Sequence, residues 1–287
     1  ITNITTPDPD SIAIGILLNG NNNIIECCEI KEIRNTAGTG FNSGSGSESD
    51  NNYAAGIINE GGPLTVNKTY VHNVQGGLIN IGCNDTLGSS DQLVSGSAFG
   101  ISTSGQITDT RVEQIESGSI IACQPASTGE EELVLLVGAA LGITDDFTQF
   151  IVPLTLQTSE QAKRNCPLEA VCSDCNLCSL TGSQANLSIE NSIVTTIISG
   201  SIISNIPHSI ITQNYAAGIA VGDQFALFIS ECIISNIRTG SATLSGDNSE
   251  LTRLGSRGII SFSLVVCIRC CTITNVTLET LSAGYCY

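Results

Sequence analysis

The sequence lacks methionine and tryptophan altogether, and only 4% of its 287 residues are aromatic and 13% charged. Glycine, serine, threonine, asparagine, isoleucine and valine dominate instead. Long helix-forming side chains are therefore few, whereas β-branched and turn-forming residues are plentiful. This composition predicts an all-β fold with many turns.

Positive charge is also scarce, because ten Lys and Arg residues stand against 27 Asp and Glu residues, for a net charge of −17. Such a balance disfavours binding to a polyanion, so we expect no nucleic-acid partner. Long apolar runs are missing too. The longest is Leu133 to Ile143, whereas a membrane-spanning helix needs about 20 apolar residues. We expect no membrane span.

Cysteine, by contrast, is frequent, with 13 in the chain. This number favours an oxidising setting, so we expect an extracellular, cell-surface or virion-surface protein. The odd count leaves at least one thiol unpaired or paired outside this sequence. The sequence begins at Ile1 without an initiator methionine or a signal pattern, which favours a processed chain or a fragment.

Internal repeats decide the predicted architecture. Three segments align through a Gly-Ile pair and through an Ile or Val eighteen residues after that glycine: "AIGILLNGNNNIIECCEIKEI" from Ala13, "AAGIINEGGPLTVNKTYVHNV" from Ala54 and "SRGIISFSLVVCIRCCTITNV" from Ser256. The marker glycines recur about every 40 residues, at Gly15, Gly56, Gly100, Gly142, Gly182, Gly218 and Gly258. Between them, short alternating segments indicate strands separated by corners, not helices.

Stacking such units as a solenoid lets equivalent strands pair at about 4.8 Å per turn. We expect Ile33, Val74, Ile237 and Val276 to form inward columns. The repeat pattern is a Gly-Ile pair followed at intervals by Asn, Ile, Cys, Ile and Ile. This pattern resembles that of right-handed parallel β-helix repeat proteins, a broad family that includes polysaccharide-processing enzymes, phage tailspikes and bacterial adhesins. It implies one continuous right-handed solenoid, with turns in 1–122 and 182–287 and an irregular, cysteine-rich turn in 123–181. Each unit could be one wide turn or two narrow ones.

Cys28, Cys232 and Cys271 share one place in the repeat, where Thr69 stands in another copy. Three interpretations stay open: small apolar side chains packed on the next turn, disulfides between turns such as Cys232 with Cys270 or Cys271, or a metal site. The irregular turn in 123–181 contains a second cluster of cysteines. We interpret these as disulfides that hold this insertion together, with a zinc site, an iron–sulfur site or free thiols as alternatives. The disulfide candidates are Cys123, Cys166, Cys172, Cys175, Cys178, Cys232 and Cys271. No metal or cofactor is predicted.

Five glycosylation sequons occur, about as many as this composition gives by chance. They start at Asn3, Asn67, Asn84, Asn186 and Asn275. Catalytic signals are weaker. The resemblance implies that enzymes of the family gather several acids with a histidine and basic residues, but the only adjacent acids in a plausible context are Asp145 and Asp146. His72 and His208 are interpreted as ordinary loop or corner residues, so no catalytic residue and no enzyme activity is predicted.

The two ends of the sequence match each other, since "ITNIT" from Ile1 corresponds to "ITNVT" from Ile273. Either the chain is a slice of a longer β-helix, or separate copies stack end to end, and both give a fibre. We therefore expect a structural or adhesive fibre whose partners are further copies of itself and, through loops, cell-surface glycans or proteins. The alternative is a polysaccharide-processing glycosidase or lyase of the same fold.

Overall fold

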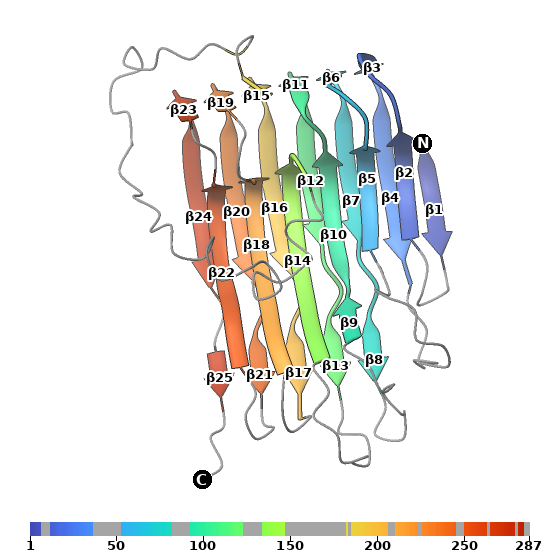
Figure 1. Ribbon diagram of the computed structural model, residues 1–287, viewed down its shortest axis with the longest axis vertical. Helices are drawn as coiled ribbons and strands as arrows, with labels where there is room; N and C mark the ends of the chain where they lie inside the picture. The colour runs from blue at the N-terminus through green and yellow to red at the C-terminus, as the bar shows by residue number, and fades with distance from the viewer. Residues whose placement is uncertain are drawn as a thin grey trace.

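The computed structural model describes residues 1–6, 12–36, 53–81, 92–122, 134–146, 182, 185–205, 210–222, 226–244, 250–262, 265–278 and 281–283. The strands in these ranges form four parallel sheets, here called A, B, C and D (Figure 1). Within the same ranges, no helix is long and apolar enough to cross a membrane. The predicted all-β parallel solenoid is confirmed.

Sheets A and B are the two large sheets, and their strands are given in the order of their pairing. Sheet A contains β1 (Thr2–Thr6), β4 (Glu29–Asn35), β7 (Tyr70–Gln75), β12 (Arg111–Glu116), β16 (Ile193–Ser199), β20 (Ile233–Thr239) and β24 (Thr272–Leu278). Sheet B contains β2 (Ile12–Leu18), β5 (Tyr53–Asn59), β10 (Ser97–Ser102), β14 (Val134–Thr144), β18 (Ile210–Val221) and β22 (Glu250–Ser261), with β9 (Gln92–Ser95) paired to β14.

Sheets C and D are made of shorter strands. Sheet C contains β3 (Asn23–Glu26), β6 (Leu64–Asn67), β11 (Gly105–Thr108), β15 (Leu187–Glu190), β19 (Ala226–Ser230) and β23 (Val265–Arg269). Sheet D contains β8 (Ile79–Ile81), β13 (Ile120–Ala122), β17 (Ile202–Ser204), β21 (Ala242–Leu244) and β25 (Leu281–Ala283). Along the chain the order is B, C, A and then D, so each repeat is one wide turn.

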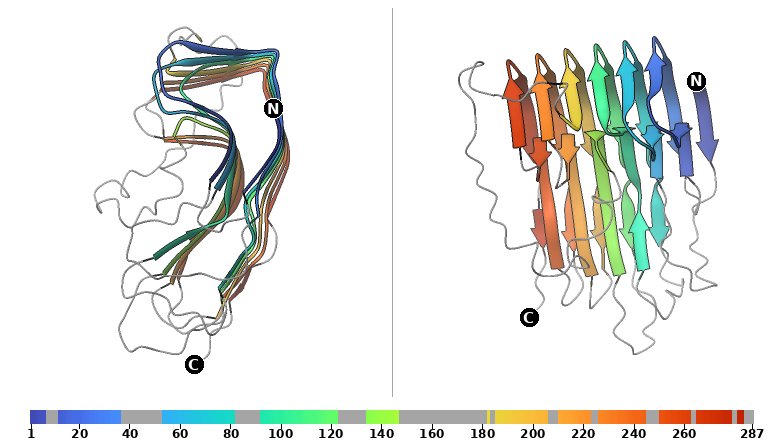
Figure 2. Two further views of the ribbon diagram at one scale, coloured as in Figure 1. Left: turned by 90° about the vertical axis from the view of Figure 1, so that its right-hand side faces the viewer. Right: turned by 45° about the horizontal axis from the view of Figure 1, so that its top comes forward.

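Seen along the stack, sheet C joins the ends of the facing sheets A and B, and the strands of successive turns lie over one another (Figure 2). The core fills the space between these sheets. Its columns are aliphatic, as in Ile4, Ile33, Val74, Ile115, Ile197, Ile237 and Val276 of sheet A. Ile33, Val74 and Ile237 are fully buried, which confirms the predicted inward columns, and Val276 is in register but belongs to the outermost turn.

The spacing of the inward residues in sheet A follows from a bend in every strand. Two outward residues separate Ile30 from Ile33 because the second of them, Glu32, has φ 57°. The same left-handed position recurs in every strand of sheet A, at Asn3, Glu32, Asn73, Gln114, Thr196, Asn236 and Asn275. A left-handed residue turns the strand without leaving the ladder, so the chain follows the curved core.

Six of the seven marker glycines lie in sheet B, on the face that packs against sheet A. A Cβ atom on Gly218 would stand 2.5 Å from Ile234 Cγ2 and 2.7 Å from the carbonyl oxygen of Gly258 in the next turn. The glycine thus allows close packing of the two sheets.

One predicted repeat is wrong. Gly182 lies beside Ser188 of β15 and not in the glycine column of sheet B. The glycine column of this turn contains Gly142, because Ile143 pairs with Ile101. The two repeats predicted from Gly142 and Gly182 therefore belong to one turn. The chain between β14 and β15 is longer than in the other turns and does not add a turn of its own.

Sheet B carries a second apolar cluster on the face away from sheet A, which the repeat pattern did not predict. Tyr53, Phe99, Leu141 and Tyr215 are buried there, and the rings of Tyr53 and Phe99 meet edge to face at 5.7 Å. The uninterrupted apolar run of "YAAGII" from Tyr53 was the available signal, because a strand buried on both faces does not alternate.

Candidate functional site

The outer face of sheet A gathers the clearest group of interacting polar side chains. Its outward positions form two columns along the stack: Glu29, Tyr70, Arg111, Ile193, Ile233 and Thr272 in one, and Lys31, His72, Glu113, Thr195, Ser235 and Thr274 in the next. The charged residues occupy β4, β7 and β12, whereas the later turns present Thr, Ser and Ile. We call the residues Glu29, Lys31, Tyr70, His72, Arg111 and Glu113 the charged patch.

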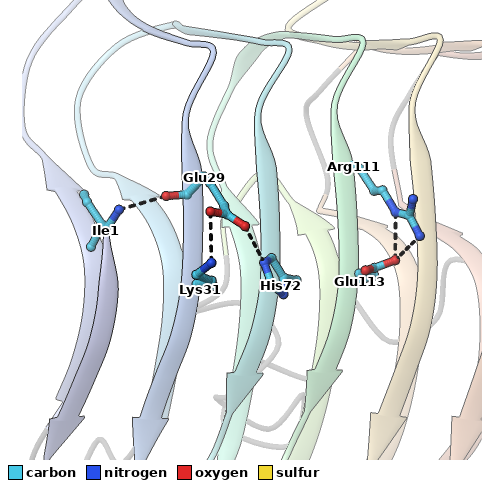
Figure 3. Close-up of polar contacts among 6 residues, drawn as sticks. All are labelled: Ile1, Glu29, Lys31, His72, Arg111 and Glu113. Atoms are coloured by element: carbon cyan, nitrogen blue, oxygen red, sulfur yellow. Dashed lines mark hydrogen bonds and ion pairs between the residues drawn. The ribbon is translucent and has the colours of Figure 1, made fainter.

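Glu29 is the centre of one half of the charged patch (Figure 3). Its Oε1 lies 3.2 Å from His72 Nε2, and its Oε2 lies 3.1 Å from Lys31 Nζ. The hydrogen bond from Lys31, followed by that from His72, lowers the pKa of the Glu29 carboxyl. The ring of His72 also stacks on that of Tyr70 at 4.1 Å, so the imidazole is held from two sides.

Arg111 forms the other half. Its Nε lies 2.7 Å and its Nη2 2.5 Å from Glu113 Oε2. The same guanidinium stands 5.4 Å from the centre of the Tyr70 ring. The Tyr70 ring therefore contacts both an imidazole from its own strand and a guanidinium from the next turn.

The contacts of the charged patch are pairs of opposite charge on the outer face of sheet A. Its His–Glu pair is completed by the cation Lys31, whereas a nucleophilic triad needs a hydroxyl or thiol at the histidine. Exposed ion pairs of this kind contribute little to stability. Over the ranges that the structure describes, no group of three or more His, Cys, Asp or Glu residues could hold a metal ion.

The interpretation of His72 as a loop or corner residue is wrong, because it lies in β7 with its ring on the outer face of sheet A. His208 lies outside the described residues. Asp145 follows β14 and is buried, and both its carboxylate oxygens accept a hydrogen bond from the backbone nitrogen of Gly222, at 3.0 and 3.1 Å. Burial raises the pKa of Asp145 against the effect of these bonds. This carboxylate links two turns of the stack.

The predicted equivalence of Cys28, Thr69, Cys232 and Cys271 is confirmed, and Thr110 and Ser192 complete their column. We call these six residues the corner ladder, because they stand between sheets C and A. Cys27, Cys28, Cys232 and Cys271 are free thiols in the structure. Cys123, Cys166, Cys172, Cys175 and Cys178 lie outside the described residues.

The sequons differ in their surroundings. Asn3 and Asn275 are exposed at the left-handed bends of sheet A. Asn67 donates to Glu26 and accepts from Thr108, and Asn186 accepts from the backbone of Ala226 at 2.9 Å. Asn84 lies outside the described residues. Glycosylation at each of these sites remains a prediction.

A second candidate surface is the edge formed by β22, β23, β24 and β25, here called the C-terminal edge. Each of these strands pairs on one side only among the described residues. Two side chains of the inner columns are uncovered there: Ile273 is 44% exposed and Val276 36%, whereas Ile234 and Ile237 one turn earlier are fully buried. The aliphatic core thus reaches solvent at this edge.

Comparisons with known proteins found no matching family model, no similar curated protein and no similar solved structure. The fold is therefore assigned from the strand pairing itself. The charged patch, the corner ladder and the C-terminal edge are the three candidate functional features of this stack.

Proposed function

We propose that this protein is a structural or adhesive fibre protein, extracellular or on the surface of a cell or virion, whose β-helices assemble end to end. The observation that supports the proposal is the uncovered core at the C-terminal edge. Ile273 and Val276 continue columns that are fully buried one turn earlier. A further turn placed on this edge would remove both side chains from water and pair the open strands.

A second copy fits this edge with one adjustment. Its β2 would pair with β22, its β3 with β23 and its β4 with β24. However, β4 already carries β1 on the side that faces the incoming molecule. β1 and β24 are equivalent strands, with Ile4 and Val276 in the same column and left-handed Asn3 and Asn275 at the same bend. The contact has room for one of them, so β24 of one copy replaces β1 of the next.

Net charge favours growth along one axis. With 27 acidic against 10 basic residues, two rods repel each other side by side. Repulsion between the sides leaves the ends, where apolar columns and open strands meet, as the favoured contact. Adhesion would then use the charged patch and the loops, which repeat along the fibre, to bind cell-surface glycans or proteins.

The experiment is electron microscopy and light scattering of the full chain over a range of concentrations, with three variants. Wild-type protein should form unbranched filaments. Val276→Asp places a charge in the column at the contact and should abolish them. Ile4→Asp weakens β1 on β4 and should lower the concentration at which filaments appear, because the edge of β4 is vacated.

Ile203→Asp is the matched control, because the substitution adds the same charge away from the end turns. Ile203 is 47% exposed and lies on sheet D. It should leave assembly unchanged. A wild-type protein that stays a compact monomer at every concentration would exclude end-to-end stacking of copies. Release of reducing ends or unsaturated products from acidic or neutral glycans would support the polysaccharide-processing alternative instead.

A further inference from the structure

The corner ladder has one chemical requirement, which is a small side chain that donates a hydrogen bond. Every member donates to the carbonyl oxygen two residues earlier: Cys28 at 3.2 Å, Thr69 at 3.0 Å, Thr110 at 2.8 Å, Ser192 at 2.8 Å, Cys232 at 3.1 Å and Cys271 at 3.1 Å. Threonine, serine and cysteine satisfy the requirement alike. A thiol is therefore not needed to form the corner.

Two thiols nevertheless stand on consecutive turns at one place. Ile233 pairs with Thr272, and the backbone nitrogen of Thr272 donates to the carbonyl oxygen of Cys232 at 2.8 Å, so Cys232 and Cys271 are stacked neighbours. Adjacent strands lie about 4.8 Å apart, inside the Cα separation of about 4.4–6.8 Å that disulfides allow. Each side chain bonds to the carbonyl oxygen two residues earlier, so the two thiols hold equivalent positions on consecutive turns.

We propose that Cys232 and Cys271 are a redox-active dithiol that closes to a disulfide between the last two turns of the stack. The inference is independent of the fibre proposal. Neither the fold nor the corner hydrogen bonds require oxidation, so the bond can open and close on a preformed site.

The two sulfurs differ in a way that assigns their roles. Cys232 is 1% exposed, whereas Cys271 is only partly buried, so an oxidant reaches Cys271 first. The hydrogen bond from Cys232 lowers the pKa of the Cys271 thiol to about 7, and the same bond together with burial raises the pKa of Cys232. Cys271 is therefore the attacking thiolate and Cys232 the resolving thiol.

The oxidant is a small-molecule disulfide. The Cys271 thiolate attacks one sulfur of this compound, breaks its S–S bond and releases one small thiol, which leaves a mixed disulfide on Cys271. Cys232 then loses its proton and attacks the Cys271 sulfur, which forms the Cys232–Cys271 bond and releases the second small thiol. The protein dithiol is oxidised and the small disulfide is reduced, so two small thiols are formed.

The bond would fasten the outermost turn. β24 pairs only with β20 among the described strands, and its inner side chains are uncovered. Such an edge strand is the part of a repeat stack most prone to local opening. A covalent link at its first corner holds β24 in register and keeps the edge available to a further turn.

The test uses the full chain, first reduced and then treated with glutathione disulfide, with free thiols trapped by alkylation and disulfides mapped by mass spectrometry. A Cys232–Cys271 link should form and reverse with dithiothreitol. Cys232→Ser and Cys271→Ser should each abolish it, and both should fold, because serine already occupies the ladder at Ser192. Cys270→Ser should leave the link intact.

Thr69→Cys provides a gain-of-function control, because it places a second thiol beside Cys28 in the same ladder and should create a second link of the same kind. The inference is overturned if Cys232 remains open to alkylation after unfolding of the oxidised protein. It is equally overturned if Cys232 is linked to any cysteine other than Cys271, such as the neighbouring Cys270.

Discussion

Single residues decide where each turn bends. The bends of sheet A use left-handed residues, and asparagine supplies four of them, because its short amide tolerates this conformation better than other side chains. Asn275 also donates to Asn236 Oδ1 at 3.1 Å, so neighbouring bends support each other. The other three are Glu32, Gln114 and Thr196, and Thr196 is the β-branched one among them, held at φ 56°.

Thr196→Asn should therefore stabilise the protein. The substitution relieves a strained β-branched residue and places an amide beside Asn236, for an expected gain of about 1 kcal/mol. Thermal unfolding followed by circular dichroism would report the gain as a higher midpoint. Thr195→Asn, one residue earlier and outside the left-handed region, should give no such increase, and an equal increase from both would exclude the explanation.

Glu29 gives the charged patch a defined pH dependence. Because Lys31 and His72 lower its pKa in the folded state from 4.5, the charged form contributes stability above that pH and loses it as the pH falls through the folded value. Glu29→Gln should thus unfold at a lower temperature than wild type near neutral pH and at the same temperature in strong acid. The difference should shrink in about 1 M salt, because exposed charges are screened there. A difference that persists in acid would assign the effect to packing.

At the scale of strands and corners, the glycine column sets how closely sheets A and B approach. Gly218→Ala would push a Cβ atom against Gly258 and Ile234, and overpacking of this kind costs about 1–3 kcal/mol. We expect a clear fall in the unfolding midpoint. Gly255→Ala is the matched control within the same sheet, because the nearest atom to its Cβ is the movable Arg257 Nη1 at 3.0 Å. Equal losses from both variants would contradict the assigned role of the column.

Most of the fold was predictable at this scale, because equivalent residues of successive turns stack on one another. The repeat period, the marker glycines and the spacing of the aliphatic residues all follow from that stacking. The pairing of Ile33 with Val74 and of Ile237 with Val276 follows the predicted columns. Gly182 was misassigned because an insertion leaves no mark in a spacing near 40 residues. The charged patch was not predictable, since Glu29, His72 and Arg111 become neighbours only when the register between turns is known.

At the scale of the whole molecule, the ends of the stack differ from its middle. Sheet A extends one strand beyond sheets B and C at the β1 end, whereas β22, β23 and β24 end together. Because of this extra strand, the length that each copy adds to a filament shows whether β1 stays in the contact between copies. Replacement of β1 by β24 adds six turns per copy, and retention of both strands would add seven in sheet A.

Helical reconstruction of the filaments by electron cryo-microscopy measures that length. The proposed contact predicts parallel strands about 4.8 Å apart along the fibre axis and an axial rise of about 29 Å per subunit, which is six strand spacings. A rise of about 34 Å would show that β1 keeps its place on β4. Filaments whose subunits meet side by side, with no continuous strand ladder between them, would contradict assembly through the ends of the β-helix.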